Sequence, residues 1–383
     1  MATCNHHPLH YDVSANAGAA GYKRPSMQQR LAATRPSGRS LRVAKVKSAG
    51  PATDEVPADS TFPAPLVLPG DELSFDPRYP PQSLRSWKQL KERNVVTDRR
   101  RTIYVGAPPK VAQDVQFVDH WAVPEAVAGA IKAPAFEDIV NYLQAFYHGL
   151  PVRVLHARKL CFVDWDDGVR KKLSSESDWA RKPRDVALAT RSEAIRIRVR
   201  KHESFPTQLN LNDLLDVAIS ILPDDAYALL MIVNHDLYED EDDDFCCKVS
   251  KTATSAALAA HLAHPSPTPG TTQSRRHLEL LWLSRVCKTA SHELGHCFGI
   301  DHCTYYACVM QGTAGLSEDA RQPPYVCPVD TAKLLTATGA DEMDWLRALL
   351  NFCERFGEDA LFAAFAAWLR MRLAELGMGY MEE

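Results

Sequence analysis

Hydrophobic and polar residues follow two different periods along the chain from about residue 83 onward. Short runs of β-branched and aromatic residues predict β-strands at 101–106, 152–155, 195–199 and 226–233. Apolar residues at helical spacing predict α-helices at 135–147 and 211–222, the second of which Asn210 can cap and Pro223 can end. Strands and helices that alternate in this way indicate an α/β (α+β) fold with a mixed, twisted sheet.

The last third of the chain is predicted to be mainly helical. An apolar face runs from His277 toward residue 298, and residues 341–376 show helical spacing that Gly357 divides into two helices. These two helices suit a packed lower subdomain better than a membrane surface. The longest apolar run, 360–369, has ten residues, which is too short to span a bilayer.

Residues 1–80 differ from the rest in composition and charge. They are rich in Ala, Ser, Pro and Arg and lack an apolar period, so we expect a disordered basic tail. Residues 1–50 carry a net charge of +7, whereas the whole chain carries −4, so the folded part is acidic and nucleic acid is not its expected partner. A tail that binds RNA or membranes remains an alternative, as does a mitochondrial transit segment.

Ten cysteines among 383 residues are too few for a disulfide scaffold. The N-terminus lacks an apolar segment of the length that a secretory signal needs. We therefore expect an intracellular protein, cytoplasmic or nuclear rather than mitochondrial, whose cysteines are reduced thiols or metal ligands.

Residues 291–302, SHELGHCFGIDH, carry the strongest chemical signal. His292 and His296 lie one helical turn apart, so both imidazoles can bind one Zn²⁺, and Glu293 is placed to accept a proton from a metal-bound water. Gly299 permits the positive φ that ends the helix and returns His302 to the metal. Three imidazoles leave a fourth position for water or substrate, which indicates a catalytic zinc.

This motif reads HExxHxxGxxH, and a Met-turn follows it, which is the metzincin pattern. Cys303, Cys308, Met310 and then Cys327 through Asp330 follow the third histidine. With these residues the chain resembles the archaemetzincin family, whose pattern continues HC-x4-C-x-M and then CxxC. The resemblance is greatest to fungal members, and it is strongest over residues 205–247 and 277–334.

The resemblance implies a zinc metallopeptidase domain at 81–377. Its upper subdomain, 81–299, would hold a five-stranded sheet and the active-site helix, and its lower subdomain, 300–377, would be mainly helical. The substrate would be peptide, with aminopeptidase action on small peptides, and Met310 would lie beneath the catalytic zinc. The family also holds a second, structural zinc with four cysteines.

This chain departs from the family at three places. Asp330 stands where the fourth cysteine is expected, so the second zinc would be held by Cys303, Cys308, Cys327 and Asp330. Gln311 replaces the usual Asn. Residues 248–275 form a Ser/Thr/Pro-rich insert in place of the Gly-rich edge strand that binds extended substrate in metzincins. An alternative function is therefore a zinc-binding protein with little or no peptidase activity. The sequence leaves the oligomeric state open.

Overall fold

The computed structural model describes residues 13–39, 62–121, 132–156, 160–165, 184–201, 207–240 and 275–379. The chain divides into two compact units, each made from two stretches. The first unit comprises Met1–Val95 and His292–Asp341, and the second comprises Val96–Ser291 and Glu342–Glu383. The boundary expected at residue 299 is therefore not where the chain divides, and the C-terminal helices group with residues 96–291.

The helices of the first unit are α1 (Ala15–Ala20), α2 (Met27–Ala33), α3 (Glu72–Phe75), α4 (Leu84–Lys88), α10 (Leu316–Arg321) and α11 (Pro328–Thr338). In the second unit they are η2 (Gln113–Trp121), α5 (Phe136–Phe146), α7 (Leu211–Ser220), α12 (Glu342–Glu354) and α13 (Ala360–Gly379). Helix α9 (Arg275–Cys297) begins in the second unit and ends in the first. The strands are β1 (Thr102–Gly106), β2 (Lys110–Val111), β3 (Val152–Leu155), β4 (Cys161–Asp164), β5 (Val186–Ala189), β6 (Ala194–Ile197), β7 (Val199–Arg200), β8 (Gln208–Asn210), β9 (Ala226–Met231) and β10 (Asp236–Tyr238).

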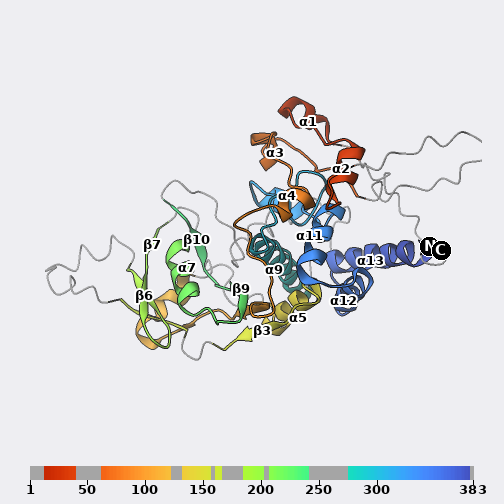
Figure 1. Cartoon of the computed structure of the whole chain (residues 1–383). Helices are drawn as coiled ribbons and strands as arrows, with labels where there is room; N and C mark the ends of the chain where they lie inside the picture. Colours follow the sequence, from red (N-terminus) through yellow and green to blue (C-terminus); the bar gives the residue numbers. More distant parts are fainter. Residues whose placement is uncertain are drawn as a thin grey trace, which may run out of the picture. The chain divides into compact units, whose positions relative to one another are not determined.

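The structure differs from the expected disordered tail, because residues 13–39 and 62–80 are folded within the first unit. The Tyr22 hydroxyl donates to the carbonyl of Thr304 at 2.6 Å, and the Phe62 ring packs edge-on against Tyr306. Figure 1 shows the red and orange helices of this stretch, with α4 beside α11. A few aromatic anchors that pack on residues 300–341 order this stretch, so it needs no apolar period of its own.

The strands of the second unit form three small sheets among the described residues. Their orders are β3-β1-β9, β10-β8-β7 and β2-β4-β5-β6. The first is parallel throughout, and the other two mix parallel and antiparallel pairs. The mixed α/β class is confirmed, whereas a single five-stranded sheet is not what these residues form.

One break between sheets has a local cause at Arg198. The predicted strand 195–199 divides there into β6 and β7. The backbone N–H of Arg198 donates to the Asp213 carboxylate at 2.7 Å, and its guanidinium also binds this carboxylate. The side chain of Asp213 thus occupies a backbone donor that a continuous strand would use in its ladder.

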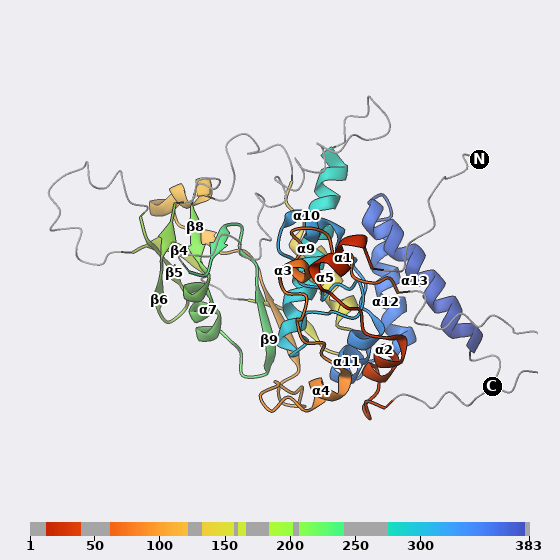
Figure 2. The same ribbon diagram turned by 90° about the horizontal axis from the view of Figure 1, so that it is seen from above.

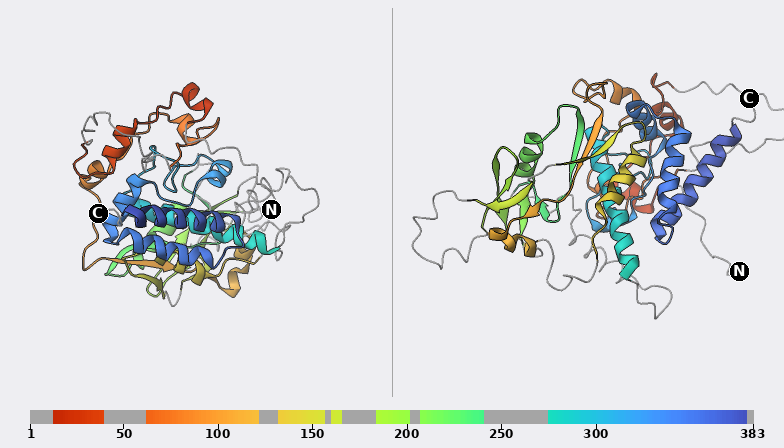
Figure 3. Two further views of the ribbon diagram at one scale, coloured as in Figure 1. Left: turned by 90° about the vertical axis from the view of Figure 1, so that its right-hand side faces the viewer. Right: turned by 90° about the horizontal axis from the view of Figure 1, so that it is seen from below.

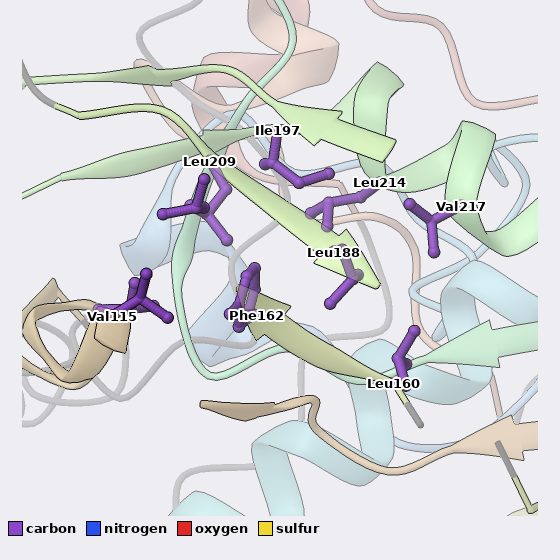
Figure 4. Packing of buried hydrophobic residues seen from close by; sticks show 10 residues of the cluster. Val115, Leu160, Phe162, Leu188, Ile197, Leu209, Leu214 and Val217 are labelled. Atoms are coloured by element: carbon purple, nitrogen blue, oxygen red, sulfur yellow. The ribbon is translucent and has the colours of Figure 1, made fainter. Parts of the chain in front are cut away.

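The core of the second unit joins η2, two of the sheets and α7. Figure 4 shows this cluster, in which Phe162, Leu188 and Ile197 are fully buried. Helix α7 packs beside β6 (Figure 2), and the Asn210 side chain caps its first turn by accepting from the N–H of Asp213 at 3.1 Å. The predicted cap is therefore confirmed. Strand β9 is fully buried only in its first half, which is less than predicted.

The C-terminal stretch forms the two predicted helices. Figure 3 shows α12 and α13, drawn in blue, running side by side. Helix α12 also packs on α5, where the Trp345 indole donates to the carbonyl of Phe146 at 2.8 Å. This contact explains why the C-terminal helices group with the second unit.

Within the described part of the chain, no helix has both the length and the apolar character needed to cross a membrane. Several sequence-based predictions lie outside that part. These are the insert as far as residue 274 and the stretches 1–12 and 40–61 of the expected tail.

Candidate metal centres

The motif helix presents its histidines as predicted. His292 and His296 lie one turn apart near the end of α9. Gly299, with a φ of 72°, takes the left-handed conformation that ends the helix, and the N–H of Ile300 donates back to the carbonyl of Gly295 at 3.2 Å. This reversal brings His302 to the other two imidazoles. The ligand atoms of the three histidines all lie within 4.8 Å of one another.

In each of these histidines Nδ1 has a hydrogen-bond acceptor, while Nε2 faces the other two rings. The Nδ1 contacts run from His292 to the carbonyl of Val309 at 2.7 Å, from His296 to the carbonyl of Ile300 at 2.9 Å, and from His302 to Oε1 of Glu72 at 2.7 Å. Carbonyl and carboxylate oxygens only accept, so each Nδ1 carries the proton. In the neutral rings each Nε2 then carries a lone pair, which is the tautomer that a metal ligand needs.

Nε2 of His292 and Nε2 of His296 are 3.0 Å apart. Two lone pairs this close repel unless a positive charge lies between them. Two ligands of a tetrahedral zinc at 2.0–2.1 Å are about 3.3 Å apart, so the pair fits one shared ion. Burial lowers the pKa of His292 to about 4, which favours the neutral form required of a ligand. The donor set therefore fits the implied zinc.

Met310 packs beneath the motif helix. A Cβ on Gly295 would lie 2.5 Å from its Sδ, so a residue without a side chain is needed at that position of the motif. Met310 is 2% exposed. Glu293, the predicted general base, is half-buried on the same helix, next to His292.

A second cluster lies where the resemblance implied it. Cys303, Cys308, Cys327 and Asp330 present ligand atoms within 4.8 Å of one another, and all four are buried. Sγ of Cys303 lies 3.5 Å from Sγ of Cys327. Oδ2 of Asp330 lies 3.5 Å from Sγ of Cys308 and 3.4 Å from Sγ of Cys327. Three sulfurs and one oxygen at these separations suit a tetrahedral zinc.

Lys333 orients the carboxylate of this cluster. Its ammonium donates to Oδ1 of Asp330 at 2.7 Å and leaves Oδ2 facing the sulfurs. Burial and the charge of Cys303 raise the pKa of Asp330 to about 7, although Lys333 opposes them. Burial would also raise the pKa of Cys303, but hydrogen bonds from Cys308 and Cys327 and the charge of Lys333 hold it well below its usual value. A stabilised thiolate is the form that binds metal.

Four polar residues that hold these clusters were missed by sequence reasoning: Glu72, Gln82, Trp87 and Lys333. The Gln82 amide donates to the carbonyl of Gly299 at 3.0 Å and accepts from Lys333 at 2.9 Å, so it links the turn after the motif helix to helix α11. The Trp87 indole donates to the carbonyl of Phe298 at 2.9 Å. The available signal was a pair of aromatic residues at the end of the expected tail, Tyr79 within it and Trp87 just after it, because aromatic residues are rare in disordered segments.

The HExxHxxGxxH motif with Met310 beneath it defines a metal centre of the metallopeptidase class. Residues 272–335 match the model of Peptidase family M54. Over this stretch the chain is similar to a family of metallopeptidases, in line with the resemblance to the archaemetzincins.

Named relatives match parts of the chain. Archaemetzincin-2 of Mus musculus is 43% identical over 72 residues, which is 19% of this chain and 20% of that protein. Archaemetzincin of Thermococcus kodakarensis is 32% identical over 110 residues, or 29% of this chain and 56% of that protein. The aligned part of this chain thus spans about a fifth of the mammalian relatives and just over half of the archaeal one. No solved structure matches.

Proposed function

We propose that this chain is a zinc-dependent peptidase in which His292, His296 and His302 hold the catalytic ion. One observation carries the proposal: Nε2 of His292 and Nε2 of His296 lie 3.0 Å apart. In both rings the other nitrogen, Nδ1, already donates to a backbone carbonyl, so the two Nε2 atoms are left to bind one ion. When bound there, zinc supplies Lewis-acid chemistry, polarising the scissile carbonyl and lowering the pKa of a bound water toward ~7.

Glu293 is the proposed general base. Its carboxylate takes the proton of the attacking water and then passes it to the nitrogen of the leaving amine. As the residue after His292 on α9, it is placed beside the first ligand by the helix itself. The substrate is therefore a peptide bond. Aminopeptidase action on small peptides is the finer proposal, and the resemblance to the archaemetzincins supports it.

The second cluster is proposed to hold a structural zinc. Three buried sulfurs and the buried carboxylate of Asp330 fill all four positions, so no ligand site stays open for substrate. The described cysteines are free thiols, as such a centre requires. We also propose an intracellular location, cytoplasmic or nuclear, which localisation of the tagged protein in cells tests.

Replacing Glu293 by Gln tests the mechanism. The metal ligands remain, so zinc content should be unchanged, while peptide hydrolysis should fall by about 10²–10⁴-fold because the base is lost. Glu92→Gln, at an exposed position, is the matched control and should keep full activity. Undiminished hydrolysis by the Glu293 variant would exclude this mechanism.

The alternative, a zinc-binding protein without effective peptidase activity, rests on the altered sequence of residues 248–275. Assay of the intact protein against a peptide library separates the two. Metal-dependent cleavage excludes the alternative, and zinc binding without cleavage supports it.

A further inference from the structure

Glu72 reaches the motif from a distant part of the sequence. It lies 230 residues before His302, in a stretch whose composition predicts disorder, yet its Oε1 accepts from Nδ1 of His302 at 2.7 Å. Both side chains are about one-quarter exposed, so the contact is largely shielded from water. Among the three histidines, His302 alone has a carboxylate on Nδ1, since the others use backbone carbonyls.

The start of helix α3, at Asp71 and Glu72, is held against helix α10. The N–H of Glu72 donates to Oε2 of Glu318 at 2.9 Å. Asp71, 3% exposed, pairs with Arg321 at 2.5 Å and accepts from the N–H of Leu68 at 2.8 Å. Helix α3 therefore begins at a fixed point, and this start directs the carboxylate of Glu72 toward His302.

Gly312 gives the carboxylate its space. A Cβ built on this glycine would overlap both oxygens of Glu72, whereas the backbone alone admits them. The position two residues after Met310 therefore accepts only glycine while Glu72 holds its place. The loop and the acidic side chain are fitted to each other.

Tyr79 braces the same histidine from a second side. Its hydroxyl donates to Oδ1 of Asp301 at 2.5 Å, and that oxygen also accepts from the N–H of His302 at 2.9 Å. The rings of Tyr79 and His302 are 5.9 Å apart. Residues 72 and 79 thus hold the third ligand in two ways, Glu72 through the imidazole and Tyr79 through the Asp301 carboxylate that accepts from its backbone N–H.

We propose that Glu72 is a positioning residue for the metal ligand His302. Its carboxylate keeps the proton on Nδ1, fixes the ring orientation and makes Nε2 a stronger donor to the metal. The inference rests on the proposed function only in that His302 is a ligand. It makes Glu72, which lies in the expected tail, part of the metal centre.

The test measures metal affinity, which needs no substrate. Zinc is withdrawn by a competing chelator from the full-length protein, Glu72→Ala, Glu72→Gln and the control Glu92→Ala. We expect Glu72→Ala to weaken one of the two zinc sites by about 10–100-fold, as is typical when the carboxylate behind a histidine ligand is lost. Glu72→Gln keeps a neutral acceptor and should lose less, and Glu92→Ala should match the parent protein.

Cobalt substitution assigns the loss to a site. Charge-transfer absorption from cobalt–thiolate bonds reports the cysteine cluster and should be unchanged, while the d–d bands of the histidine site should weaken or shift. Parent-like affinity in both Glu72 variants would overturn the proposal. If Glu72→Ala fails to fold, Glu72→Gln decides, and parent-like affinity in that variant overturns it.

The outcome is separable from the proposed function. Weakened metal binding by the Glu72 variants in a protein that cleaves no peptide would support the positioning role and reject the peptidase. Full metal affinity and full turnover in these variants would reject the positioning role alone. In an active enzyme, Glu72→Ala should lower kcat more than it changes KM once zinc is supplied in excess.

Discussion

The buried pair of Asp330 and Lys333 allows loss of metal to be separated from loss of folding. The side chain of Asp330 is 1% exposed and that of Lys333 is 2% exposed. Asp330→Ala removes a proposed zinc ligand and also strands the ammonium of Lys333 without its carboxylate. The double variant Asp330→Ala/Lys333→Met removes the ligand together with the buried ammonium.

The magnitudes follow from burial. Breaking a buried ion pair by removing one partner costs about 3–5 kcal/mol, whereas replacing both partners by apolar groups is often neutral. In a unit of this size, a loss of about 3 kcal/mol lowers Tm by about 10 °C. The hydrogen bond from Lys333 to Gln82, at 2.9 Å, offsets a small part of the loss in the single variant.

Zinc per chain and calorimetric Tm are measured on the same preparations after dialysis against a mild chelator. We expect two zinc ions for the parent protein, one for Asp330→Ala and one for the double variant. The Tm of the double variant should lie well above that of Asp330→Ala. Replacing His292 and His296 by Ala should also leave one ion, in the other centre.

Two results would refute this reasoning. A double variant that retains two zinc ions shows that Asp330 is not a ligand. Equal Tm values for Asp330→Ala and the double variant show that the stranded charge of Lys333 is not what destabilises the single variant.

Two further predictions concern buried side chains. Gly295→Ala should lower the free energy of unfolding, measured by chemical denaturation, by about 1–3 kcal/mol, because the new Cβ would overlap Met310. The control Gly377→Ala has open space around the new Cβ and should not destabilise the protein. A Gly295→Ala protein as stable as the parent would contradict the packing of Met310 on this helix. Burial lowers the pKa of His235, whose Nε2 donates to the carbonyl of Val118 at 3.0 Å, so the unfolded chain binds protons more readily. The stability that neutral His235 contributes is present above about pH 6.5 and falls as pH drops toward its folded pKa, by at most about 1.4 kcal/mol per pH unit. The free energy of unfolding should therefore fall less steeply with decreasing pH in His235→Gln than in the parent protein. Equal slopes for the two proteins would contradict the assignment.

Local patterns predicted most of the secondary structure. The strand 152–155 and the helix that begins after Asn210 appear where periodicity and capping place them. These signals lie within a few residues of one another, so they are readable from sequence. The break at Arg198 is not, because its cause is a side chain fifteen residues away in a helix.

The members of both clusters could be predicted, because they follow one another within a short stretch and His, Cys and Asp at such spacings are typical of metal sites. The supports of those ligands could not. Glu72 and Gln82 contact residues more than 200 positions later, and neither is an unusual residue type for a polar segment. Only the fold shows that this segment has a partner.

The first unit is assembled from two stretches that are about 200 residues apart in the chain. At a synthesis rate of 5–20 residues per second, the earlier stretch leaves the ribosome about 10–40 s before its partner exists. During that time Tyr22, Phe62 and Trp87 lack the contacts that they make to Thr304, Tyr306 and Phe298 in the finished protein. The metal centre can therefore form only after residues 292–341 have been synthesised.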